Sequence, residues 1–560
     1  MKKVLFASLL LMLVVMIIPT ISIKAETGDM GNGDLFYHWS NEEGVQDTKI
    51  STNSSETYKE TDRKWQGIPA VHLTKGGRLW CAIQTGDEGE NGNVYLDNYD
   101  VMYYSDDYGK TWSENYLIFD CREESIRLTG PTLFEDQFGK LWLVLVRGGG
   151  NGTYAVEMKN PDCDNPEEEL EFGKPISWLK FPPAHKPTIL SNGRWITPIE
   201  ATIKNQQTYI CNPNNETGVY SWKSITQTPA ASSFENKNCA EAQILELLDG
   251  SLMMLSRLPG STGDGMEISY SDDFGANWTP YKAFNGEPYQ TPGSKFYIAR
   301  LDSGNVMLIT HATTESRTKL CVYLSTDDCK TWPYKMMLDD SDVRNKWGVS
   351  YPDASQRQGE HGEIYIVYDA GRYDQKEIRL SIITEEDIMA GHPVSEYASL
   401  RNIVNKPSEY KTYVGVKESF EKYYYVPLGT TKDTILNTLP TSLTLVGEDN
   451  TELSLTGTWR SSGYISTIKG TYTASFSFNE SMPGLYEDRY SLLNVYIIVG
   501  EEKEEPTELE GNKTTVIPTT TTEPTQDKGG CKGSLSISLI SSIVLLMGSL
   551  IIVKKKNRNI

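Results

Sequence analysis

Residues 239–257 read CAEAQILELLDGSLMMLSR, and residues 271–278 read SDDFGANW. The first stretch holds two apolar runs separated by Leu-Asp-Gly, and Gly250 suits the positive φ that a tight hairpin turn requires. Neither run has the 3.6-residue period of an amphipathic helix. The stretch therefore predicts two antiparallel β-strands joined by a short turn.

The same pattern of apolar strand, glycine turn and apolar strand occurs six times along the chain. The turn glycines are spaced 54 to 62 residues apart, and a repeat of this size is typical of a solenoid or a propeller. A ring of four-stranded blades fits best, because closing the ring protects the sheet edges. We therefore predict an all-β fold that begins with a six-bladed β-propeller. The turn glycines are Gly77, Gly139, Gly193, Gly250, Gly304 and Gly362.

A second repeat lies out of phase with the first. SDDYGKTW ends at Trp112, SDDFGANW at Trp278 and STDDCKTW at Trp332. This is the Asp-box pattern, S-x-D-x-G-x-T-W, of sialidase and BNR-repeat propellers. Its Ser and Asp bond their own turn and its Trp packs between blades, although Cys329 replaces the glycine in the third copy. We expect the boxes to be structural and to lie between the third and fourth strands of their blades.

The two ends of the chain indicate export and anchoring. Lys2 and Lys3 precede an apolar run, and Ala25 offers a small residue for cleavage, as in a secretory signal peptide. Near the other end, an uncharged 19-residue run is followed by a basic cluster. Such a run spans roughly 28 Å as a helix, about one hydrocarbon core, and the basic cluster should stay in the cytoplasm. The sequence therefore predicts a body exposed outside the cell on one membrane span.

Between the propeller and the span, the composition changes twice. The segments LPTSLTLV and GTYTASFSF resemble a bacterial immunoglobulin-like repeat, and the stretch after them is rich in Glu, Thr and Pro, which favours disorder. We predict these parts: signal peptide 1–25, propeller 27–405, β-sandwich Ig-like domain 418–500, disordered stalk 501–530, C-terminal transmembrane helix 535–553 and cytoplasmic tail 554–560.

Charge and cysteine content restrict the partners. The net charge is −22 at pH 7, and such a surface repels nucleic acid and anionic lipid. The eight cysteines include no CxxC pair and no zinc-ligand spacing. We predict no metal and no other cofactor, and we expect extracellular glycans as partners.

Polar side chains converge where the blades open. In a four-stranded blade the first strand starts, and the second strand ends, on the same face, so these positions line one central mouth. A concave site that gathers Arg, Glu, Tyr, Lys and His favours binding or catalysis. The first-strand positions are Gly67, Pro131, Lys186, Glu241, Lys295 and Tyr351; the second-strand positions are Thr85, Arg147, Glu200, Arg257, His311 and Asp369.

The segment from about Trp65 to Gly391 resembles the bacterial BNR/Asp-box exo-α-sialidase (neuraminidase) family. The likeness is carried by WQGIPAVHLTKGGRLW, HKPTILSNGRW, CAEAQILELLDGSLMMLSR and VSYPDASQ through IYIVYDAGR. It implies a tyrosine nucleophile at Tyr351 paired with Glu241, and carboxylate-binding arginines at Arg257 and Arg317. It also implies an aspartate acid in the first-blade loop, TGDEGENGNVYLDNYD, for which Asp97 is the favoured candidate.

The chemistry that the resemblance implies is physically consistent. Sialic acid carries a carboxylate on its anomeric carbon, which would repel an Asp or Glu nucleophile. A tyrosine approaches neutral and loses its proton to a nearby carboxylate, which it needs because its free pKa is about 10. Arginine binds the substrate carboxylate as a planar fork. The sequence thus predicts a cell-surface retaining sialidase that releases terminal sialic acids, with Tyr351 as nucleophile.

One position departs from the family. The family has Arg-Ile-Pro where this chain has Gly67-Ile68-Pro69, so one carboxylate-binding arginine is missing. The charge-assisted hydrogen bond that this arginine would make contributes about 1.5–3 kcal/mol to substrate binding. Arg63 or Arg147 could replace the missing arginine. The departure leaves two alternatives open: a non-catalytic glycan-binding or adhesion propeller, and a propeller glycosidase or lyase acting on another sugar.

Overall fold

The computed structural model describes residues 36–39 and most of 58–500. The gaps within the second range are 87–97, 121–126, 148–151, 174, 180–182, 203–204, 217, 219, 232–239, 259–264, 284–285, 315, 341–347, 360–361, 374, 408–410, 448, 462–463, 480–485 and 489–491. The predicted signal peptide, stalk, transmembrane helix and tail lie outside the described residues. Among the described residues, no helix is both long and apolar enough to cross a membrane.

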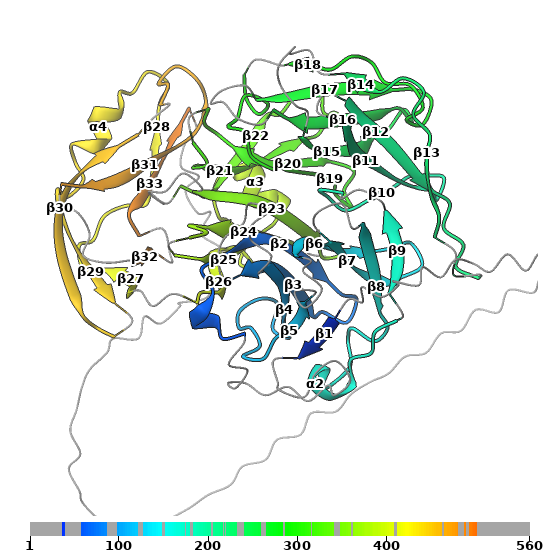
Figure 1. The fold of residues 1–560 in the computed structure, drawn as a ribbon. Helices are drawn as coiled ribbons and strands as arrows, with labels where there is room; N and C mark the ends of the chain where they lie inside the picture. The colour runs from blue at the N-terminus through cyan, green and yellow to red at the C-terminus, as the bar shows by residue number, and fades with distance from the viewer. Residues whose placement is uncertain are drawn as a thin grey trace, which may run out of the picture. The chain divides into compact units, whose positions relative to one another are not determined.

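Almost all of the described chain is β-structure, and six consecutive sheets hold the first 26 strands (Figure 1). Sheet 1 contains β1 (Phe36–Trp39), β2 (Trp65–Leu73), β3 (Leu79–Gly86), β4 (Asn98–Ser105) and β5 (Leu117–Asp120); sheet 2 contains β6 (Leu128–Glu135), β7 (Leu141–Arg147), β8 (Thr153–Met158) and β9 (Ile176–Leu179). Sheet 3 contains β10 (Thr188–Ile189), β11 (Trp195–Thr202), β12 (Asn205–Cys211), β13 (Trp222–Ser224) and β14 (Ala230–Ala231); sheet 4 contains β15 (Ala240–Glu246), β16 (Leu252–Arg257), β17 (Met266–Ser271) and β18 (Lys282–Ala283). Sheet 5 contains β19 (Tyr297–Arg300), β20 (Val306–His311), β21 (Leu320–Ser325) and β22 (Tyr334–Asp339); sheet 6 contains β23 (Val349–Gln356), β24 (Ile364–Ala370), β25 (Glu377–Ile383) and β26 (Ser399–Asn405). The short helices are η1 (Glu60–Asp62), α2 (Pro166–Glu169), α3 (Glu385–Ala390) and α4 (Lys432–Leu436).

Each sheet opens with the antiparallel hairpin that the sequence predicts. All six predicted turn glycines have positive φ, between 60° and 98°. The strands beside them are almost wholly buried: every residue of β3, β7 and β24 is inside. Apolar runs buried on both faces need covering on both sides, so each sheet requires a neighbour.

The hydrophobic core consists of layers between neighbouring sheets. Sheets 1 and 2 share one cluster, sheets 2 and 3 the next, and the series continues to sheets 5 and 6. A further cluster joins sheet 6 back to sheet 1, packing Tyr365 and Val367 against Val71 and Tyr103. The first strands β2 and β23 also contact each other. The sheets therefore form a closed, propeller-like series.

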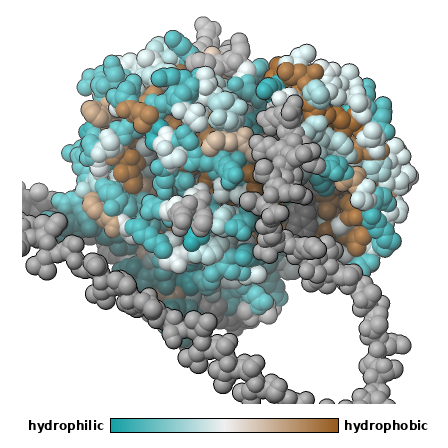
Figure 2. All heavy atoms as spheres, turned by 180° about the vertical axis from the view of Figure 1, so that it is seen from behind, coloured by the Kyte–Doolittle hydropathy of each residue, from teal (hydrophilic) through white to brown (hydrophobic). Residues whose placement is uncertain are grey.

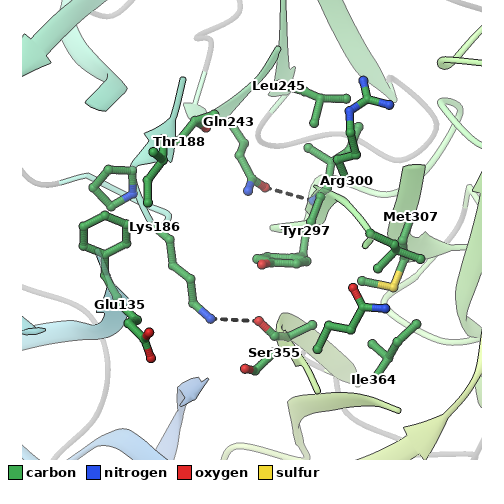
Figure 3. A pocket seen from close by; sticks show the side chains of 18 of the residues that line it. Glu135, Lys186, Thr188, Gln243, Leu245, Tyr297, Arg300, Met307, Ser355 and Ile364 are labelled. Carbon is green, nitrogen blue, oxygen red and sulfur yellow. Dashed lines mark hydrogen bonds between the residues drawn. The ribbon is translucent and has the colours of Figure 1, made fainter. Parts of the chain in front are cut away.

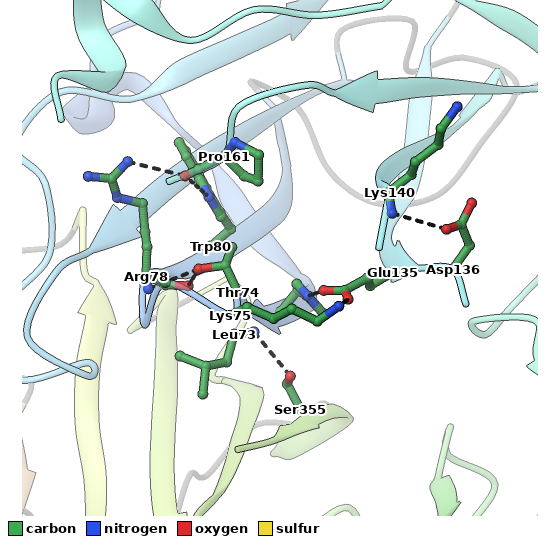
Figure 4. A network of polar contacts seen from close by, with 12 residues as sticks. Leu73, Thr74, Lys75, Arg78, Trp80, Glu135, Asp136, Lys140, Pro161 and Ser355 are labelled. Carbon is green, nitrogen blue, oxygen red and sulfur yellow. Dashed lines mark hydrogen bonds and ion pairs between the residues drawn. The ribbon is translucent and has the colours of Figure 1, made fainter. Parts of the chain in front are cut away.

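Polar contacts reinforce the joints between sheets (Figure 4). The Leu73 amide of sheet 1 donates a 3.0 Å hydrogen bond to Ser355 of sheet 6. On the other side, Glu135 of sheet 2 accepts from His72 at 2.9 Å and pairs with Lys75 at 3.1 Å. Sheet 1 is thus held on both flanks.

The three Asp boxes are the turns between β4 and β5, between β17 and β18, and between β21 and β22. With β2 counted as the first strand of the sheet 1 blade, each box joins the third and fourth strands, as predicted. In the second box, the Ser271 hydroxyl donates to Asp273 and accepts from the Gly275 amide, each at 2.9 Å. The same bonds recur in the other two boxes, and Cys329 adopts φ 67° at the glycine position. Trp278 is buried between sheets 3 and 4, so the box also joins two sheets.

The last described part is one seven-stranded sheet with its own core around Trp459 and Phe476. Two of its pairings are parallel, β27 with β32 and β28 with β33. The Ig-like assignment of 418–500 stays a prediction. The strands are β27 (Lys411–Val416), β28 (Tyr423–Val426), β29 (Ser442–Gly447), β30 (Glu452–Arg460), β31 (Gly470–Phe478), β32 (Tyr486–Asp488) and β33 (Asn494–Val499).

One face of the surface is drawn in Figure 2. Hydrophilic residues predominate on it, and hydrophobic residues form separate groups among them.

Candidate functional site

The candidate site is built on irregularities at the start of the first strands. The pairing of β2, β6, β15 and β23 with their second strands shifts register in the first few residues. At each shift one residue has positive φ: Ile68 at 54°, Gly130 at 49°, Glu241 at 46° and Tyr351 at 56°. Bulges of this kind re-aim a side chain, and here they present Glu241 and Tyr351 beside each other.

Tyr351, Glu241 and Arg257 form a closed triangle of polar contacts. The Tyr351 hydroxyl donates a 2.9 Å hydrogen bond to Glu241 Oε1. Arg257 Nη1 donates to the Tyr351 oxygen at 3.0 Å and lies 2.9 Å from Glu241 Oε2. The carboxylate is therefore placed to take the phenolic proton, and the guanidinium is placed to stabilise the phenolate that results.

Burial and the neighbouring charges set the protonation state of Tyr351. Burial raises the pKa of Tyr351 to about 12, and the Glu241 carboxylate adds to the rise. The surrounding arginines lower it, with Arg257 first. At neutral pH the tyrosine is therefore protonated at rest, and it ionises only as its proton passes to a base.

Arg317 lies in the segment between β20 and β21, the second and third strands of sheet 5. Its guanidinium carbon lies 5.3 Å from the centre of the Tyr351 ring, and its Nη2 donates to the Gly293 carbonyl at 3.0 Å. The structure thus brings together four of the five predicted site residues: Tyr351, Glu241, Arg257 and Arg317.

Sequence reasoning missed a third arginine at the tyrosine. Arg372 follows β24 and is fully buried, with its guanidinium carbon 4.1 Å from the Tyr351 ring centre. Arg63 and Arg147, the suggested replacements for the missing arginine, pack over other tyrosines: Arg63 lies 4.8 Å from the Tyr116 ring centre and Arg147 lies 5.3 Å from that of Tyr154. That either replaces the missing arginine stays a prediction. The signal that could have found Arg372 is its position three residues after Asp369, itself a predicted mouth residue.

Residues 77–366, more than half of the chain, match the family model described as the BNR repeat-like domain. The chain belongs to the BNR repeat-like family. Among curated proteins, no sequence matches this BNR repeat-like chain.

Several solved structures are similar to this BNR repeat-like protein at low identity. A Hadza microbial sialidase, Hz136, is 16% identical over 60% of this chain and 69% of its own, with a TM-score of 0.44. A leech intramolecular trans-sialidase is 13% identical over 61% and 71%, also with a TM-score of 0.44. The NanB sialidase of Streptococcus pneumoniae is 16% identical over 61% and 72%, with a TM-score of 0.41.

Two buried histidines form hydrogen bonds to the backbone of the strands that carry Glu241 and Tyr351. His185 hydrogen-bonds through Nε2 to the Glu241 carbonyl at 3.0 Å, and His311 to the Val349 carbonyl at 2.8 Å. Burial lowers the pKa of His185 well below its usual value and that of His311 to about 4. Both are therefore neutral at pH 7 and donate from Nε2 to the strands that carry Glu241 and Tyr351.

The predicted acid, Asp97, lies outside the described residues, which resume at Asn98. The same loop also carries Asp87, Glu88, Glu90 and Asp100, and of all these carboxylates Asp100 is the one that the structure describes. It is buried in β4 between Gln84 and Phe119, and burial raises the pKa of its carboxyl well above the usual range.

A pocket of about 470 Å³ opens at the other end of the first strands (Figure 3). Its lining includes Glu135, Glu246, Arg300 and Gln356, each the last residue of a first strand. Tyr351, Glu241 and Arg257 are not among its lining residues, but Gln243 and Ala354 are, two and three residues beyond Glu241 and Tyr351 on the same strands. Within the part of the chain that the structure describes, no group of His, Cys, Asp or Glu could hold a metal ion.

Proposed function

We propose that this chain is a cell-surface exo-glycosidase, a retaining sialidase that releases terminal sialic acids from extracellular glycans. The observation that carries the proposal is the 2.9 Å hydrogen bond from the Tyr351 hydroxyl to Glu241 among arginines. Sialidases with a tyrosine nucleophile are an exception to the usual pair of catalytic carboxylates. A sialidase needs this exception because its substrate carries a carboxylate at the reacting carbon.

The proposed reaction has two steps. Tyr351 Oη attacks the anomeric carbon while its proton passes to Glu241, and the bond from that carbon to the leaving oxygen breaks as Asp97 protonates the oxygen. Asp97 then takes a proton from water, which attacks the same carbon. The bond from that carbon to Tyr351 Oη breaks, and Glu241 returns its proton to the tyrosine oxygen. Arg257 and Arg317 bind the substrate carboxylate throughout. Two displacements at one carbon retain its configuration.

The rest of the chain serves this activity at the cell surface. We propose that the six sheets are the blades of one propeller, that the 418–500 region is an Ig-like spacer, and that the 535–553 span anchors the protein in the cell membrane. Gly67 favours both alternatives, a non-catalytic glycan-binding or adhesion propeller and a propeller glycosidase or lyase acting on another sugar, because one arginine of the sialidase pattern is absent there. The Tyr351–Glu241 pair favours an enzyme over a purely binding propeller.

The test is hydrolysis of a fluorogenic N-acetylneuraminic acid glycoside by the full chain. Tyr351→Phe removes the nucleophile and should abolish turnover, and Glu241→Gln removes the base and should lower kcat by about 10²–10⁴-fold. Tyr297→Phe is the matched control, since Tyr297 is another buried tyrosine on a neighbouring first strand, and it should keep wild-type kcat.

Two results would count against the proposal. A folded wild-type chain that leaves the glycoside intact contradicts a sialidase and directs the search to other sugars. Full turnover by Tyr351→Phe contradicts the nucleophile. Thermal unfolding of each variant shows that the propeller is intact.

A further inference from the structure

Arg372 reaches the tyrosine site from an unexpected element. It follows β24 after Ala370 and Gly371, and Gly371 adopts φ 58°, which turns the chain at the end of the strand. The side chain of Arg372 is fully buried and its guanidinium lies over the face of the Tyr351 ring, 4.1 Å from the centre. It lies nearer to the ring than Arg257 at 5.7 Å or Arg317 at 5.3 Å.

The guanidinium of Arg372 occupies the space that a side chain at position 67 would need. A Cβ placed on Gly67 would lie 2.9 Å from Arg372 Nε and 3.0 Å from Asp369 Oδ2. Contacts this short require a neighbour to move, so an arginine at position 67 would displace the Arg372 guanidinium from its present place. The absence of a side chain at Gly67 therefore leaves space for the Arg372 side chain from sheet 6.

Asp369 holds Arg372 in this orientation. Its Oδ2 accepts from Arg372 Nε at 3.0 Å and lies 2.9 Å from Nη2. The same oxygen accepts the Ile68 amide at 3.0 Å, and Oδ1 accepts the Ser350 hydroxyl at 2.7 Å. One buried carboxylate thus fixes the guanidinium together with the two bulged strands that flank it.

The charges around Tyr351 favour a bound anion. Arg257, Arg317 and Arg372 bring three positive charges, and the carboxylates of Glu241 and Asp369 bring two negative ones. The buried lysine Lys295 interacts with both Glu241 and Arg372 and adds to the positive side. Positive charge in excess and largely removed from water favours a negatively charged ligand.

We propose that Arg372 is the third substrate-binding arginine and that it binds the carboxylate of the sugar together with Arg257 and Arg317. Arg372 comes from sheet 6, whereas the family pattern places this arginine at position 67 in sheet 1. Asp369 is its positioning residue. The inference rests on the proposed function for the identity of the sugar, and on the geometry around Gly67 for the role of the arginine.

The first experiment measures kcat/KM for the sialoside and for its methyl ester in the full chain. Arg372→Lys keeps a charge but loses the planar fork, and it should lower kcat/KM for the carboxylate substrate roughly 10- to 150-fold. The value of kcat/KM for the methyl ester should fall much less, so the ratio of kcat/KM for the acid to that for the ester should decrease. Arg379→Lys is the matched control, because Arg379 is another buried arginine of sheet 6, paired with Asp339 at 2.6 Å, and it should leave the preference unchanged.

The second experiment moves the arginine back. Arg372→Ala should lose the acid preference, and Gly67→Arg in the Arg372→Ala background should restore part of it, at least 10-fold over Arg372→Ala alone. Gly67→Arg in the wild-type background should instead destabilise the protein, because the two side chains compete for one space. A purely structural Arg372 would shift thermal unfolding but leave the acid-to-ester ratio at its wild-type value, and that result overturns the inference.

Binding of N-acetylneuraminic acid to the Tyr351→Phe variant, measured by calorimetry, separates the two proposals. Turnover by wild type with an unchanged acid-to-ester ratio in Arg372→Lys overturns the inference and leaves the sialidase proposal standing. If the wild-type chain shows no turnover but N-acetylneuraminic acid binds and Arg372→Lys weakens that binding, the sialidase proposal is overturned and the role of Arg372 stands. If there is neither turnover nor binding, both proposals are overturned.

Discussion

At the scale of single residues, buried histidines couple the stability of the protein to pH. Burial lowers the pKa of His311 to about 4, against about 6.5 when unfolded. Between these values the unfolded chain binds more protons, so this contribution is complete above pH 6.5 and is lost as the pH falls toward 4. At 1.36 kcal/mol per unit, it amounts to about 3 kcal/mol. We expect His311→Gln, which keeps a donor for the Val349 carbonyl, to reduce the loss of unfolding free energy between pH 6.5 and 4. Denaturant unfolding at several pH values checks this, and an unchanged slope in the variant contradicts it.

The site residues show what sequence can and cannot foresee. The positions of Tyr351, Glu241 and Arg257 followed from a rule about where strands of a blade begin and end, together with a family likeness. Arg372 escaped that rule because it stands beyond the end of its strand, and its aim depends on the turn at Gly371 and on the buried carboxylate of Asp369. Contacts of this kind depend on packing between sheets that are far apart in sequence, as Gly67 and Arg372 are.

At the scale of elements, each Asp box is a turn that also fills a joint between sheets. Gly275 has φ 88°, and a Cβ there would lie 3.0 Å from Ile196 Cδ1 and from Thr208 Cγ2 of sheet 3. Gly275→Ala should therefore cost about 1 kcal/mol for the backbone and more for the displaced neighbours. Gly304→Ala is the control, since Gly304 has φ 90° with nothing within 4 Å of a Cβ, and it should show the backbone cost alone. Equal shifts in the thermal midpoint of the two variants would show that the box does not press on sheet 3.

The repeat period and the Asp boxes predicted these elements well because both are local signals. Hairpin turns, box hydrogen bonds and apolar runs all lie within one repeat, so the sequence carries them directly. The pairing of the seven-stranded sheet depends on parallel contacts between strands far apart in sequence, and no local pattern indicated them.

At the scale of the whole molecule, one lysine links three sheets across the centre. Lys186 of the segment before β10 pairs with Asp353 at 3.0 Å and donates to the carbonyls of Val71 and Ala354, each at 2.8 Å. Lys186→Met removes the paired cation from the buried Asp353 carboxylate, which keeps a 2.8 Å hydrogen bond from the Val71 amide, and should cost up to about 3–5 kcal/mol. Lys75→Met is the control: its side chain is 70% exposed and pairs with Glu135, so its loss should cost less than about 1 kcal/mol. Similar thermal midpoints for the two variants would mean that the central link does not hold the series closed.

The left-handed backbone at the first-strand bulges has a consequence for selection on this protein. Tyr351 at φ 56° and Glu241 at φ 46° each hold a conformation that costs an L-residue about 1–3 kcal/mol, whereas Gly130 occupies the corresponding bulge of sheet 2 without that strain. Glycine in place of either residue would relax the chain while removing its chemistry. Selection for thermal stability alone would therefore favour glycine at both bulges, at the expense of the Tyr351 and Glu241 side chains.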